Sequence, residues 1–247
     1  MKTVVTFTNN KVQILCGEGT SENISVTKII EVQFDMNCVM NGVITDTETF
    51  CAGMKKAFTE NALPKSGVIL SLDGNNIKSK KVVIPKVNSE KTQEIVAREF
   101  QEIEVLENPI FGFITMAKGE KTQEIIAIGT EFEFIKNLVQ AFKAIGIKIG
   151  MITSTRCAMI RLTDYLDFIA HKNCIIQTLD GETLTSILIE NGAFMNISNS
   201  RVFSEHGTTS FGTEVARSIS QLLQFQSSQR STNVVTEVFL GGFSPED

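Results

Sequence analysis

The sequence lacks several features that would place it in a common functional class. Its 247 residues contain no apolar run near the roughly 20 residues of a membrane-spanning helix, and its start, Met1-Lys2-Thr3-Val4, lacks a signal-peptide core. The 23 basic and 28 acidic residues are scattered rather than striped, so there is no footprint for nucleic acid or an anionic membrane. We therefore expect a cytoplasmic protein that binds no nucleic acid and inserts no part of this chain into a membrane.

Cysteine and histidine are few, and they are isolated. No two cysteines form a CxxC pair and their total is odd, which argues against both a disulfide framework and a zinc site: Cys16, Cys38, Cys51, Cys157 and Cys174. Neither His171 nor His206 stands in a recognisable catalytic pattern. We predict no metal site and no catalytic residue.

The clearest start and stop signals lie between residues 125 and 162, which read as strand, helix, strand and helix. Ile125–Ile128 is an apolar run, and Thr130-Glu131-Phe132-Glu133 has the spacing of a capping box that begins a helix at its second residue. Gly146 ends this helix, and Ile147–Ile152 is short and β-branched. Because a helix links the two strands, we predict a right-handed βαβ unit with parallel strands.

Apolar periodicity and turn residues predict further elements on both sides of this segment. Before it, we expect strands at 4–7, 12–15, 25–34, 43–44, 68–72, 77–84 and 111–115 and helices from 47 and from 90. After it, we expect strands at 174–178, 184–189, 193–197, 201–205 and 234–240 and a helix at 213–226. Both ends of the chain thus contain a meander followed by a helix, which suggests an internal duplication of architecture.

The hexapeptide Glu-Lys-Thr-Gln-Glu-Ile occurs twice, at 90–95 and at 120–125. We interpret the first copy as a helix, because Ser89 precedes it as a cap and a helical apolar stripe follows. We interpret the second copy as a strand, because Gly119 precedes it and a continuous apolar run follows. Tertiary context can override the weak propensity of such a segment.

Changes in the order and type of the expected helices and strands predict three domains. Residues 1–34 and 108–172 form a first lobe, residues 35–107 form a small inserted α+β domain, and residues 173–247 form a second lobe. Near the end, a strand at 234–240 and the Gly241-Gly242 turn lead to an element that the sequence does not contain. We therefore expect a reduced second lobe, incomplete at its C-terminus, in a fragment of a longer protein.

Several short stretches of the sequence, taken in their order, resemble PilM, the actin-like cytoplasmic protein of type IV pilus machines. They are Asn41-Gly42-Val43-Ile44-Thr45-Asp46, 68–73 with 77–85, 90–103, 138–142 with Gly146-Ile147, Ala158-Met159-Ile160-Arg161, and Gln224-Phe225-Gln226 before 234–242. The resemblance covers nearly the whole chain. It implies an inserted domain that the cell-division protein FtsA has in a different form. It implies an α/β, actin-like (ribonuclease H-like), two-lobed fold with a small inserted α+β domain.

The resemblance also implies a nucleotide site, with a phosphate turn in the first hairpin of each lobe and an adenosine site near the last glycine pair. The matching positions are Asn9, Asn10, Lys11, Asp180, Gly181, Glu182, Thr183, Gly241 and Gly242. The first turn lacks the family's acidic residue and glycine, and an aspartate expected near Thr178 is absent, although Asp180 is a candidate replacement. The subdomain that relatives insert after Arg201 is also missing. We predict a degenerate site with no cofactor; ATP with magnesium is the alternative.

Two turns of this site have simpler interpretations. Asn9-Asn10 is typical of a plain hairpin turn, and Asp180-Gly181 is an equally strong hairpin signal. The alternatives, a surviving phosphate loop in the first turn and a metal site in the second, stay open at this point.

By resemblance, the protein is a non-enzymatic scaffold for fimbrium biogenesis in a type IV pilus or related type II secretion machine. Its partner would be the cytoplasmic N-terminal tail of a PilN-type inner-membrane protein, beside other pilus assembly components, which would hold it at the inner membrane. The tail would lie between the first lobe and the inserted domain, along an edge lent by strands 68–72 and 77–84. The rival hypotheses are an actin-like ATPase or small-molecule kinase, and the cytoplasmic head of a larger membrane-anchored protein of such a machine.

Overall fold

The computed structural model describes residues 1–247 except 8–10, 21–22, 36–37, 41, 73–75, 102–105 and 164, and also leaves out the side chains of 11 and 101. The chain divides into two compact units, residues 1–158 and residues 159–247. Among the described residues, none of the helices combines the length and the apolar composition that crossing a membrane requires. The predicted turn residues Asn9 and Asn10 lie outside the described part.

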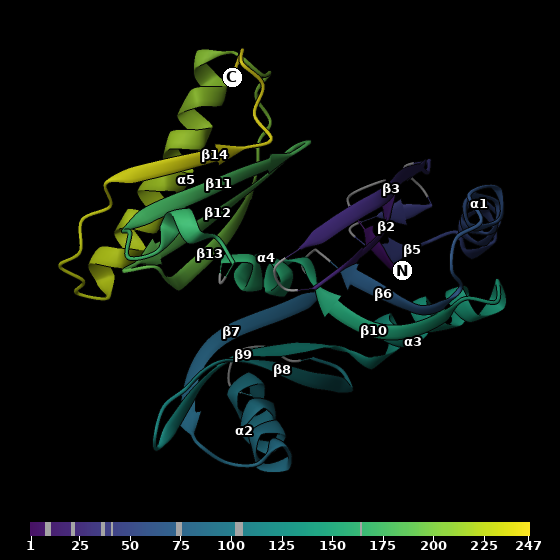
Figure 1. The fold of residues 1–247 in the computed structure, drawn as a ribbon, viewed down its shortest axis with the longest axis horizontal. Coiled ribbons are helices and arrows are strands. Elements are labelled where there is room, and N and C mark those ends of the chain that lie inside the picture. The colour runs from purple at the N-terminus through teal and green to yellow at the C-terminus, as the bar shows by residue number, and fades with distance from the viewer. Residues whose placement is uncertain are drawn as a thin grey trace. The chain divides into compact units, whose positions relative to one another are not determined.

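The first unit is built on a five-stranded sheet in the order β3-β2-β1-β6-β10 (Figure 1). Its strands are β1 (Lys2–Phe7), β2 (Lys11–Gly19), β3 (Ile24–Gln33), β6 (Ser66–Leu72) and β10 (Lys148–Ser154). The first three form the predicted antiparallel meander, whereas β6 pairs parallel to β1 and β10 pairs parallel to β6. A minor hairpin, β4 (Val39–Met40) and β5 (Val43–Ile44), follows β3.

The helices α1 (Thr47–Glu60) and α3 (Phe132–Ala144) contribute to the core of this sheet. Asp46 caps α1 by accepting the Thr49 N–H at 3.1 Å, so the helix begins where the sequence predicted. The Phe50 ring is fully buried, with its centroid 5.9 Å from that of Phe7 and 5.7 Å from that of Phe142. Aromatic packing therefore joins both helices to the sheet.

A smaller antiparallel sheet in the order β7-β9-β8 is inserted between β6 and α3. It consists of β7 (Ile77–Pro85), β8 (Pro109–Lys118) and β9 (Thr122–Glu131), and α2 (Ser89–Gln101) packs on one face. The two copies of the repeated hexapeptide fall in α2 and in β9, which confirms the predicted helix and strand. They also meet, because the Gln123 side chain donates to the Thr92 hydroxyl at 3.1 Å.

The predicted insertion and the predicted βαβ unit need correction. Two segments of the expected 35–107 insertion, α1 and β6, belong instead to the large sheet and its core, and β8 and β9 belong to the small sheet. Since β9 and β10 lie in different sheets, they form no βαβ unit. The hydroxyl of Thr130 donates to the Asn76 carbonyl rather than capping α3, which has Glu131 as its N-cap without a side-chain bond. Gly146 has φ +78° and ends this helix as predicted.

The helix α4 (Thr155–Thr163) follows β10, and Ser154 caps it by accepting the Cys157 N–H at 3.0 Å. Tyr165 is exposed, and Ile169 is buried in a separate 3-10 turn, η1 (Asp167–Ile169), rather than in the same helix.

The second unit carries a four-stranded sheet in the order β13-β12-β11-β14. Its elements are β11 (Cys174–Asp180), β12 (Thr183–Glu190), β13 (Ala193–Arg201), α5 (Thr209–Ser228) and β14 (Glu237–Gly241). The strand β13 is continuous to Arg201, where the sequence suggested two short strands. As in the first unit, an antiparallel meander is followed by a helix and then by a strand parallel to the first, which confirms the duplicated architecture.

Candidate functional site

The second unit brings two predicted parts of the nucleotide site to one end of its sheet. The strands β11 and β14 run parallel, with Thr178 opposite Gly241, so the turn after β11 and the glycine pair after β14 emerge together. Lys11 lies in the first unit, where its backbone pairs with Gln33 at the start of β2. Thus the β11–β12 turn and the glycine pair lie at the same end of this sheet.

The turn between β11 and β12 is explained by its own fold. Asp180 pairs with Thr183 across a two-residue connection in which Gly181 has φ +58°. The Glu182 carboxylate accepts from the Arg201 guanidinium at 2.8 Å and its carbonyl accepts the Val202 N–H, which ties the turn to the end of β13. These contacts hold the turn, with its Asp180 and Glu182 carboxylates, in place without a ligand.

The glycine pair likewise has a packing explanation. Gly242 has φ +78°, and a Cβ at this position would overlap the Leu179 carbonyl oxygen. A Cβ at Gly241 would be 3.6 Å from the Thr178 side chain, an ordinary contact. The close approach of this backbone to β11 requires glycine at 242 without any ligand.

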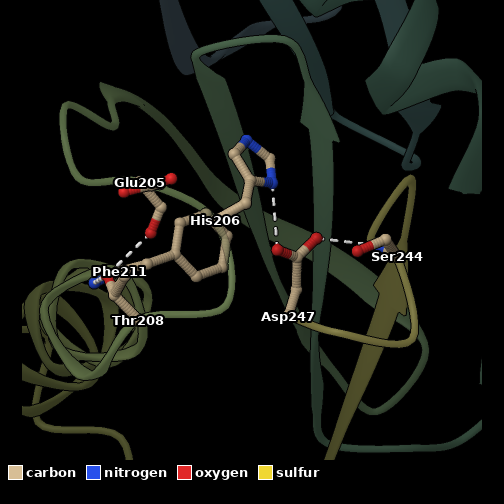
Figure 2. A network of polar contacts seen from close by, with 6 residues as sticks. All are labelled: Glu205, His206, Thr208, Phe211, Ser244 and Asp247. Carbon is tan, nitrogen blue, oxygen red and sulfur yellow. Dashed lines mark hydrogen bonds and ion pairs between the residues drawn. The ribbon is translucent and has the colours of Figure 1, made fainter.

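A polar network that the sequence did not predict lies beside this end of the sheet (Figure 2). The His206 ring nitrogen Nδ1 is 2.9 Å from Asp247 Oδ1, and the other carboxylate oxygen accepts the Ser244 N–H. The Ser244 backbone bond, with His206 as a smaller contribution, holds the pKa of Asp247 below its ordinary value. His206 and Asp247 are 41 positions apart, so no local sequence pattern predicts their contact.

The same network begins α5. Thr208 accepts the Phe211 N–H at 3.2 Å as the N-cap and donates its hydroxyl to the Glu205 carbonyl, while the His206 ring stacks on Phe211 at 4.8 Å. Threonine is a preferred N-cap residue, so Thr208 marks the start of α5 in the sequence. The predicted start at Thr213 is therefore too late. Through His206, these contacts connect Asp247 to Phe211 of α5. Neither residue is a nucleophile that His206 could activate.

The described side chains offer little for metal binding or covalent catalysis. No three His, Cys, Asp or Glu residues within the described ranges converge in a group suited to a metal ion. Burial raises the pKa of the Cys157 and Cys174 thiols, which favours the protonated, less nucleophilic form.

The small inserted sheet presents a different candidate site, the free edge of β7. Lys86 donates its N–H to the Lys121 carbonyl at 2.9 Å, and the alternation of an antiparallel ladder then turns Ser79, Lys81 and Val83 outward. Pro85 falls in the same outward phase, where it costs the ladder no hydrogen bond. At Ser79 and Val83 the edge therefore carries backbone donors and acceptors that no described strand pairs.

Two strands were predicted to offer an edge to a peptide, and only β7 lies at the edge of its sheet. The strand β6 lies between β1 and β10, so its backbone is already paired on both sides and that part of the prediction is wrong. On β7, Val83 is 66% exposed, and Lys80 and Lys81 form ion pairs with Glu99 and Glu124, each at 2.7 Å.

Comparison with known proteins gives structural but no sequence relatives. No protein-family model and no curated protein matches the chain. A chain of the solved "PilM-PilN type IV pilus biogenesis complex" is similar over 98% of this chain and 81% of its own, with a TM-score of 0.76 and 11% identity. A Bacteroides thetaiotaomicron protein of unknown function, described as having an actin-like ATPase fold, is similar over 99% of this chain and 82% of its own, with a TM-score of 0.58 and 12% identity.

The chain has an actin-like fold. The similarity confirms the predicted α/β, actin-like fold and, at the level of structure, the resemblance to PilM. In this actin-like chain, each of the two units carries one copy of the meander, helix and strand, and the β7-β9-β8 sheet with α2 lies in the first unit between β6 and α3. At such low identity, the comparison supports the fold, and function has to be argued from the sites.

Proposed function

We propose that this protein is a non-enzymatic cytoplasmic scaffold of a type IV pilus or related secretion machine. Its β7 edge would bind the cytoplasmic N-terminal tail of a PilN-type membrane protein. The edge position of β7, beside which no described strand lies, is the observation that carries the proposal, because it stands on a fold shared with a chain of a PilM-PilN complex. The partner, rather than this chain, would hold the protein at the inner membrane.

Strand addition suits such an edge. An extended peptide would gain main-chain hydrogen bonds from the outward groups of Ser79 and Val83, and its alternate side chains would contact the sheet faces. This mode of binding requires no titratable catalytic group. Binding by strand addition is therefore compatible with a β11–β12 turn in which Glu182 already contacts Arg201.

We expect Val83→Pro to weaken binding of a synthetic PilN-type tail by about tenfold or more, because proline removes an outward N–H and its ring obstructs the added strand. Val83→Thr keeps the branched shape and the N–H, so it should bind as the unmodified protein does. Fluorescence anisotropy of a labelled tail measures both, and circular dichroism checks the fold.

Absence of saturable binding to the unmodified protein at high micromolar concentration would argue against this proposal, as would equal binding by both variants. Asp180→Ala supplies a second control and should leave tail binding unchanged. Loss of binding in that variant, with cooperative melting retained, would move the site to the second-unit turn.

An actin-like ATP-binding protein is the second candidate, favoured by the assembly of the β11–β12 turn and the Gly241-Gly242 pair at one sheet end. We expect ATP with magnesium to leave the melting temperature unchanged, because the Glu182 carboxylate already accepts from the Arg201 guanidinium and would repel a phosphate. A ligand present at a hundred times its dissociation constant adds about 2.7 kcal/mol to stability. A clear upward shift in differential scanning fluorimetry would favour the ATP-binding function instead.

A further inference from the structure

Arg156 reaches the β7 edge from outside the small sheet. It is the second residue of α4, and its guanidinium Nη1 donates to the Ser79 hydroxyl at 3.3 Å. The two residues are 77 positions apart in the chain. Their contact places a partly buried cation beside a position of β7 whose backbone faces outward, so the cation lies next to the path of any strand added there.

Arg156 has no carboxylate partner among the residues that the structure describes. Its hydrogen bond there goes to the neutral Ser79 hydroxyl. Two lysines of the same strand are placed differently, because Lys80 and Lys81 pair with glutamates of α2 and β9, each at 2.7 Å. A partly buried guanidinium that has given up hydration without gaining a carboxylate favours the arrival of an anion.

The start of α4 adds to the positive potential at this point. The N-terminus of a helix carries a partial positive charge that acidic side chains commonly offset, and the first turn of α4 contains no acidic residue. An arginine in this turn is therefore electrostatically unfavourable within the chain itself. An anionic group supplied by a ligand would stabilise both the Arg156 guanidinium and the helix N-terminus.

The alternation of β7 decides on which face of the sheet this anion must lie. Val82 and Ile84 belong to the core that α2 covers. Because neighbouring strand residues alternate, Ser79 and Val83 point to the opposite face. A residue directly opposite Ser79 in an added strand would extend its side chain on that face, toward the guanidinium. A residue four positions away would lie opposite Val83, which is 66% exposed.

We infer that the polypeptide bound at the β7 edge carries an acidic side chain that pairs with Arg156, four residues after an apolar side chain that covers Val83. The order follows from antiparallel addition, which is the direction of both pairings within this sheet. A carboxylate can accept two parallel hydrogen bonds from one guanidinium, so the pair would fix the register of the added strand as well as strengthen its binding. This inference rests on the proposed strand addition at β7 and assigns the chemistry of the partner there.

The probe is a labelled nine-residue peptide of threonines with valine at its third position and glutamate at its seventh. We expect saturable binding to the full chain by fluorescence anisotropy, weakened about tenfold by Arg156→Gln because the ion pair is lost. Arg98→Gln is the matched control, since it removes the same charge from an exposed position on α2, which covers the other face of the sheet. It should bind as the unmodified protein does.

Two altered peptides test the pair from the partner's side. A peptide with glutamine in place of glutamate should bind the unmodified protein about tenfold more weakly and should lose nothing further in Arg156→Gln. A peptide with valine and glutamate exchanged has the same composition and charge but the wrong register, so it should also bind more weakly. The glutamine peptide tests the ion pair even if circular dichroism shows that Arg156→Gln does not fold.

Three results would overturn this inference alone. They are equal binding by Arg156→Gln and the unmodified protein, equal binding of the exchanged peptide, and no binding of the probe while the PilN-type tail still binds and is weakened by Val83→Pro. The last result would leave the proposed function standing without its acidic anchor. Failure of both the probe and the tail to bind would instead reject the β7 edge as a site, and the inference with it.

Discussion

Gly242→Ala is expected to destabilise the second unit by about 3 kcal/mol or more, one of the largest effects of any single substitution in this chain. The residue has φ +78°, where an L side chain costs about 1–2 kcal/mol. The added Cβ would also overlap the Leu179 carbonyl oxygen, so the backbone of β11 or of the turn must shift. Urea denaturation followed by circular dichroism measures the loss.

Gly241→Ala is the matched control, because its Cβ would make only an ordinary contact with the Thr178 side chain. It should cost less than about 1 kcal/mol. Equal stability of the two variants would show that the backbone does not approach β11 as closely as the structure has it. Large losses in both would instead assign the pair a shared role, such as a ligand turn.

Phe50→Ala is expected to cost about 3–5 kcal/mol, in this case in the first unit. The ring is fully buried, and its centroid lies 5.4 to 5.9 Å from those of three other phenylalanines: Phe7, Phe34 and Phe142. Truncation leaves a cavity between the sheet, α1 and α3 that rigid neighbours cannot fill. The free energy of unfolding from denaturant titration reports the change.

Phe132→Ala provides the comparison, since Phe132 is 41% exposed at the first turn of α3. Its loss should be within about 1 kcal/mol of the unmodified protein. A small effect of Phe50→Ala would mean that the aromatic cluster does not join α1 to α3, and that another contact holds these helices on the sheet.

The turns of the predicted nucleotide site show why a site residue is difficult to assign from sequence. Asp180-Gly181 and Gly241-Gly242 match a ligand turn and a structural turn equally well, because both need glycine at positive φ. The structure adds the neighbours, Arg201 on Glu182 and Leu179 against Gly242, and these contacts explain the turns without a ligand. A turn of this geometry alone therefore does not decide whether a ligand binds there.

Local physics was sufficient for most elements. The helix expected from residue 47 is α1, and the apolar residues that recur along it at helical spacing, Phe50, Met54, Ala57 and Phe58, are all buried. The two copies of Glu-Lys-Thr-Gln-Glu-Ile were assigned correctly from flanking residues alone, because a preceding cap and a following apolar pattern decide between helix and strand. Fold class followed from the order of these elements and their resemblance to PilM.

The partners of the strands were decided by tertiary structure. The apolar runs of β6 and β9 are compatible with any sheet, so the sequence placed β6 in the insertion and β9 beside β10, and the structure places both elsewhere. Long-range polar contacts such as His206 with Asp247 also lacked any local signal. By itself, the sequence determined which segments are helices and strands and which face each buries, because periodicity and caps act within a few residues. Which sheet each strand joins depends on burying two faces at once, and only the folded chain sets that.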